Sequence, residues 1–183
     1  TDPLDRRAFP YPAYTLLLFW PADEIPFSVV RVAVVALLAA LTLASVFLWL
    51  RALAWRPTWK WCAVILLLVL CSYPVLEGLY AGQVGLLVAF MLAASILAMQ
   101  RGRLLLAGIL MALTTIKPQV SVLAIFYLVL WSLCDWRKRG RYCVGFFSTL
   151  LLLFATSLAV WPHWLYSWTT PLVAYHRSTT PVL

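Results

Sequence analysis

Long apolar stretches, separated by short polar segments, fill most of this chain. A helix that crosses a bilayer needs about 20 mostly apolar residues, and the stretches over 29–50 and 143–161 meet that need. Between them lie shorter apolar runs over 61–73, 84–99 and 104–133. The pattern predicts an all-α fold, a polytopic bundle of about five full transmembrane spans, or six when short broken helices are counted.

The run over 104–133 is ambiguous because Lys117-Pro118 interrupts it. It forms either one helix kinked at the proline or two segments that turn at 116–119. Basic residues decide between the two, since loops on the cytoplasmic side carry an excess of Lys and Arg. Three basic clusters separate the runs: Arg51, Arg56 and Lys60; Arg101 and Arg103; Arg137, Lys138, Arg139 and Arg141. Only a turn at 116–119 puts all three basic clusters on the cytoplasmic side of the membrane, so we favour the turn.

Composition excludes a soluble domain. Hydrophobic residues make up 64% of the 183 positions and charged residues only 11%, against about 45–50% and about 25% in ordinary soluble domains. The net charge of +8 raises nucleic acid as a partner, but the charges lie in loops between spans, so membrane lipids are the expected partner and nucleic acid is not. We expect a multi-pass protein of the plasma (inner) membrane.

The charge pattern also predicts three parts: an outer-face loop and interfacial segment over 1–28, the transmembrane bundle over 29–162, and an outer-face tail over 163–183. The short run over 13–20 is expected at the interface because it cannot cross the bilayer. Since the chain begins at Thr1 and ends in an apolar phrase at Leu183, we expect a piece of a longer protein.

Lys117 is the strongest candidate for a binding residue. Ionisable groups at membrane depth are costly and point to function, and a lysine is a compact cation suited to a phosphate. A helix that starts at Pro118 would add free N–H groups. The alternative is that Lys117 extends its charge to the outer headgroups. The non-basic polar residues fall on the same outer face, which predicts a recessed cavity there.

The segment 73–83, YPVLEGLYAGQ, is predicted as a loop of this outer face. Its carboxylate and amide, Glu77 and Gln83, can hydrogen-bond hydroxyl groups, and the ring of Tyr80 can pack on a sugar or an isoprenoid chain. The alternative is an ordinary interfacial turn with tyrosines in the aromatic belt. Other candidate binding residues on this face are Gln119 and Tyr11, followed by His176 and Arg177.

Several further polar residues have a plainer interpretation. The acids Asp23 and Glu24 are interpreted as a solvated loop, although a carboxylate can act as a general base. Arg31 either reaches the headgroups or lines the cavity. Neither His163 nor His176 has partners at metal-ligand spacing, so no metal is predicted.

The run YPVLEGLYAGQVGLLVAFMLAASILAMQRGRLLLAGILMALTTIKPQ resembles the glycosyltransferase family 87 proteins. These polytopic GT-C fold enzymes include polyprenol-phosphate-mannose-dependent mannosyltransferases. The matching elements are Gly82-Gln83, the RGR turn, Ala107-Gly108 and the motif at 116–119. The upstream segment FPYPAYTLLLFWPADEIPF also looks like the part that follows the first large outer loop of that family.

The resemblance implies transfer of a hexose, with mannose as the expected sugar, from a polyprenyl-phosphate donor to a glycan or glycolipid acceptor on the outer, periplasmic face. It implies no cofactor beyond the lipid-linked sugar. Members carry a catalytic aspartate in the first outer loop, which here corresponds to the region upstream of Phe9, so the base is expected before Thr1. The rival functions are a secondary transporter or lipid flippase, whose helices are also interrupted, and an inert membrane scaffold.

Overall fold

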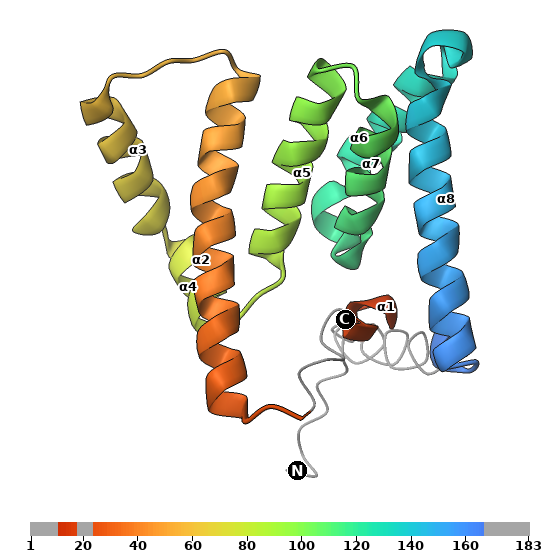
Figure 1. The fold of residues 1–183 in the computed structure, drawn as a ribbon, viewed down its shortest axis with the longest axis horizontal. Helices are drawn as coiled ribbons and strands as arrows, with labels where there is room; N and C mark the ends of the chain where they lie inside the picture. The colour runs from red at the N-terminus through yellow and green to blue at the C-terminus, as the bar shows by residue number, and fades with distance from the viewer. Residues whose placement is uncertain (1–10, 18–23, 167–183) are drawn as a thin grey trace, which may run out of the picture. The chain divides into compact units, whose positions relative to one another are not determined.

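The computed structural model describes residues 11–17 and 24–166, and within them the fold is all-α with no strand, as predicted (Figure 1). The helices are α1 (Tyr14–Leu17), α2 (Phe27–Ala52), α3 (Trp59–Leu70), α4 (Tyr73–Tyr80), α5 (Gly85–Gln100), α6 (Leu104–Leu113), the 3₁₀ turn η2 (Thr114–Ile116), α7 (Pro118–Leu133) and α8 (Trp136–Val160).

Helix length divides these elements into two classes. Helices α2 and α8 are long and apolar enough to cross a membrane, and α3 with α4 forms a third candidate span that bends by 57°. The other apolar segments, α5, α6 with η2, and α7, are shorter. At 1.5 Å per residue, the 16 residues of α5 extend about 24 Å, less than the ~30 Å of a bilayer core. These are the short helices that the apolar pattern anticipated.

The chain divides into two compact units. The first comprises residues 1–23 and 151–183, and its described part is held by aromatic rings. The ring of Phe154 lies 6.3 Å from that of Tyr14 and 5.6 Å from that of Trp164, measured between centroids. The second unit, Glu24–Leu150, contains α2 to α7 and the first part of α8.

Within the second unit, α6 and α7 form a hairpin. The start of α6 lies against α8, because a Cβ on Gly145 would collide with the backbone oxygen of Leu105. The end of α7 also lies beside α8, since the Ser132 hydroxyl donates to the Arg139 carbonyl at 2.7 Å. Both ends therefore meet the start of α8, which confirms a turn at residues 116–119. The basic clusters, at the α2–α3 and α5–α6 connections and in the first turns of α8, share one end of this unit (Figure 1).

Small residues let the helices of the second unit approach closely. A buried cluster joins α5, α6, α7 and α8, and its members include Ala107, Met111, Leu128 and Phe146. At Gly108 an added Cβ would collide with the Tyr142 backbone oxygen and lie 2.7 Å from the Phe146 nitrogen. Close backbone approach through small residues is typical of helix pairs in membranes.

Two boundaries differ from the sequence prediction. Helix α8 begins at Trp136, so the basic cluster at 137–141 lies in its first turns and not in a loop. In its first turn, the backbone N–H groups of Lys138 and Arg139 donate to the Asp135 carbonyl, at 3.2 and 2.9 Å. The prediction assumed that apolar content sets helix ends, but Arg and Lys are themselves good helix formers.

The predicted loop over 73–83 is also partly helical. Pro74 stands in the first turn of α4, where a proline loses no hydrogen bond, so it starts a helix and does not merely end the preceding one. The loop prediction for Glu77 and Tyr80 was wrong, because both belong to α4. Only residues 81–84 connect α4 to α5.

Three helices end in the same type of turn. In this turn a residue with positive φ lets the backbone N–H groups that follow the helix donate to its last carbonyls. Gly82 (φ 61°) ends α4 and Gly102 (φ 72°) ends α5, but at the end of α2 the position is taken by Ala54 (φ 52°). The hydrogen bond that marks this turn, from Trp55 N to Leu50 O, measures 2.9 Å. A side chain with left-handed backbone is strained.

We expect Ala54→Gly to stabilise the protein by about 1 kcal/mol because glycine adopts positive φ without that strain. The thermal midpoint in detergent should rise by roughly 2–4 °C. Gly102→Ala, at the equivalent position of α5, should lower it by a similar amount. Equal midpoints for all three proteins would contradict the assignment.

Candidate functional site

Lys117 lies at the junction between η2 and α7. Its backbone (φ −129°, ψ 75°) is not helical, and Pro118 follows as the first residue of α7. A proline disfavours helical geometry in the residue before it, which explains why the chain turns here. The backbone N–H of Lys117 donates to Thr114 O at 3.1 Å. The side chain of Lys117 is half-buried.

The Lys117 ammonium contacts the start of α5. Its Nζ donates to Gln83 Oε1 at 3.4 Å, a contact between residues far apart in the sequence. A Cβ on Gly85 would lie 3.2 Å from the same Nζ. Because Gly85 has no side chain, the ammonium reaches the first turn of α5, and the two motifs form one site.

The connection between α4 and α5 fixes the position of Gln83. Its backbone N–H donates to Gly78 O at 2.7 Å, closing the turn in which Gly82 has positive φ. This hydrogen bond ties Gln83 to the end of α4. The backbone of Gln83 is therefore held in place, and its side-chain amide contacts Lys117.

Further hydrogen bonds support the junction from within. The buried Ser121 hydroxyl, in the first turns of α7, donates to Thr114 O at 3.2 Å. The Thr114 hydroxyl in turn donates to Met111 O at 2.7 Å. These bonds satisfy polar groups that would otherwise be costly in an apolar environment. They connect α6, η2 and α7 at the junction that contains Lys117.

The electrostatics of this site favour an anion. The first N–H groups of a helix have no partner within it and carry partial positive charge. Helix α5 lacks a side-chain cap at this end, and the Lys117 ammonium lies beside its first turn. Within residues 11–17 and 24–166, no carboxylate forms an ion pair with Lys117. A phosphate group matches such an arrangement.

Within the described part of the second unit, no hydrogen bond or ion pair joins the Lys117 side chain to Glu77, Tyr80 or Gln119. Glu77 and Tyr80 are exposed on α4, where Tyr80 retains 81% of its accessible surface. Gln119 is exposed in the first turn of α7. Tyr11 is half-buried in the first unit. Of the plainer candidates, Glu24 and His163 are exposed, and the predicted residues that lie outside the described part are Asp23, His176 and Arg177.

Sequence reasoning did not find the partner of Gly85. Gly85 lies two residues after Gln83, but nothing in the order of residues links it to Lys117. The available signal was the pair of glycines on either side of Gln83 and Val84, since a glycine at a helix start often marks close approach by another group.

Comparison with known proteins adds one finding. The family model of glycosyltransferase family 87 matches residues 9–182. The matched region includes both Gln83 and Lys117. Searches among curated proteins and among solved structures find no matching chain.

Proposed function

The chain belongs to glycosyltransferase family 87, and from this premise we propose that it moves a hexose, mannose, from a polyprenyl-phosphate donor to a glycan or glycolipid acceptor. Family membership together with the apolar helices makes it a membrane glycosyltransferase. The donor, the acceptor and the outward-facing, periplasmic side of the plasma membrane are the proposed parts.

The observation that carries the proposal is the contact of Lys117 with Gln83 and Gly85. A polyprenyl-phosphate sugar has one phosphate next to the bond that breaks, and Lys117 offers a positive charge beside the uncapped start of α5. The site belongs to helices shorter than a full span, and we propose that it lies below the surface of the bilayer. A lipid-bound phosphate can therefore approach it from the bilayer.

In the proposed reaction an acceptor hydroxyl attacks the anomeric carbon while the bond from that carbon to the phosphate oxygen breaks. The hydroxyl proton passes to a carboxylate base, expected upstream of Thr1, and polyprenyl phosphate leaves. Lys117 stabilises the negative charge that grows on the leaving phosphate, which is typically a large contribution to catalysis. Gln83 orients the Lys117 ammonium, while Glu77, Tyr80 and Gln119 are proposed to contact sugar or acceptor.

A secondary transporter or lipid flippase is the rival function, because interrupted helices occur there too. Such a protein would move the lipid-linked sugar without breaking the bond to phosphate. Membership of a glycosyltransferase family favours the enzyme.

The purified protein in liposomes separates these functions. With a polyprenyl-phosphate hexose labelled in the sugar, we expect label to appear in an added glycan or glycolipid acceptor together with free polyprenyl phosphate. A nucleotide sugar should give no product. Use of the nucleotide sugar alone would contradict the proposed donor, and movement of intact donor across the bilayer would indicate a transporter.

A further inference from the structure

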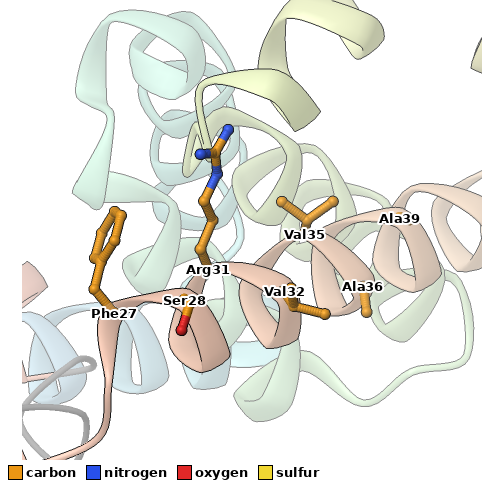
Figure 2. A pocket seen from close by; sticks show the side chains of 7 residues that line it. All are labelled: Phe27, Ser28, Arg31, Val32, Val35, Ala36 and Ala39. Carbon is orange, nitrogen blue, oxygen red and sulfur yellow. The ribbon is translucent and has the colours of Figure 1, made fainter.

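Helix α2 carries a groove that the proposed reaction does not use. It encloses about 610 Å³, and the described residues that line it all belong to the N-terminal half of α2. Figure 2 shows its seven lining side chains. Five are Phe, Val or Ala, and the two polar ones are Ser28 and Arg31. The groove is thus apolar with a cation near one end.

Arg31 has no counter-charge in the described part of the chain. No hydrogen bond or ion pair engages its guanidinium there, and the first turn of α2 contains no acidic residue. A cation near a helix N-terminus is electrostatically unfavourable, because that end of the helix is already positive. Arg31 therefore stands where an anion from outside the chain would be stabilised.

The groove has the length of one bilayer leaflet. In Figure 2 the Arg31 side chain extends beside Phe27 and Val35, one turn before and one turn after it. From Arg31 to Ala39, the last lining residue, the axis of α2 extends about 12 Å. Half of a ~30 Å hydrocarbon core is about 15 Å. A single acyl chain with its headgroup at Arg31 matches this distance.

We propose that this groove binds one anionic phospholipid of the surrounding membrane, with its phosphate at Arg31 and one acyl chain along Val35 and Ala39. A guanidinium can form paired hydrogen bonds with a phosphate. In Figure 2 the Ser28 hydroxyl points away from the Arg31 guanidinium, so Arg31 alone supplies the polar contact. The small side chains of Ala36 and Ala39 leave the space that the chain occupies.

A phospholipid suits this groove better than the long isoprenoid of the proposed donor. The lining ends within about one leaflet, and it is open on the exposed face of a helix long enough to span the bilayer. The lipid site is also independent of Lys117, because its binding needs no glycosyl transfer. The two proposals can therefore fail separately.

Native mass spectrometry of the delipidated protein tests the proposal. Phosphatidylglycerol, phosphatidylcholine with the same acyl chains, and polyprenyl phosphate are added in graded amounts. We expect one phosphatidylglycerol to bind roughly tenfold more tightly than phosphatidylcholine, the effect of one charge-assisted contact. Arg31→Gln should abolish this preference, and Arg31→Lys should retain part of it.

Two variants serve as controls. Ala36→Phe should weaken both phospholipids by filling the groove, and Arg56→Gln, an exposed cation beyond the other end of α2, should change nothing. Equal binding of the two phospholipids to the unaltered protein would overturn the proposal. So would a preference that survives Arg31→Gln, or tighter binding of polyprenyl phosphate that displaces phosphatidylglycerol.

Discussion

Replacing Lys117 with glutamine is expected to lower glycosyl transfer by about 100-fold or more, the usual cost of removing one group that stabilises charge in the transition state. Glutamine can still hydrogen-bond Gln83, so the loss isolates the charge. The fold should persist, since the half-buried ammonium has no ion-pair partner in the described chain. Initial rates with a polyprenyl-phosphate hexose, together with the thermal midpoint, measure both effects.

Two further variants show whether the position of the charge matters. Gly85→Ala adds a methyl group 3.2 Å from Nζ, which the flexible lysine can avoid by moving. We expect transfer to fall by roughly tenfold with an unchanged midpoint, because small displacements at a reacting centre are costly. Lys138→Gln removes an exposed cation of the basic end and should be neutral. Full activity in the Lys117→Gln protein would refute the phosphate-binding role.

The largest effect on stability is expected from Gly108→Ala. The added methyl group would collide with the Tyr142 carbonyl and lie 2.7 Å from Phe146 N. Both are backbone atoms, which cannot rotate away, so α6 and α8 must separate. Overpacking typically costs 1–3 kcal/mol, and here we expect about 3 kcal/mol. The thermal midpoint in detergent should fall by roughly 10 °C.

Val144→Ile is the matched control for this substitution. It also adds one carbon to the same helix pair, but Val144 is 52% exposed on α8, so the midpoint should not change. Gly145→Ala, which would collide with Leu105 O, should reproduce the effect of Gly108→Ala. If Gly108→Ala and Val144→Ile have the same midpoint, the two helices are not in backbone contact there.

The sequence was sufficient for the features that depend on apolar length and on charge. It predicted α2 because 26 residues of low polarity have one stable arrangement in a membrane. It also predicted the turn at Lys117, since the basic clusters constrain which ends share a side. Helix ends were harder to predict. Helix α8 includes Arg137 and Arg141, which the apolar pattern had left outside the helix.

The candidate site was predicted in part. Lys117 and Gln83 were both singled out, but as separate motifs, because 34 positions separate them. Their contact depends on the lengths of α5 and α6 and on how closely the two helices pack, which no local pattern encodes. Glu77 was predicted in the same loop as Gln83, but it lies on the exposed surface of α4.

The hydrogen bond from the Ser95 hydroxyl to Ala107 O, 2.8 Å long, bears on how the protein enters the membrane. Helix α6 has only 10 residues, about 15 Å, too few for a segment that inserts by itself. Gly102 turns the chain so that α5 and α6 lie together, and Ser95 ties them within the apolar layer. We therefore expect α5 and α6 to enter the apolar layer together, as one helical hairpin, and not as two separate segments.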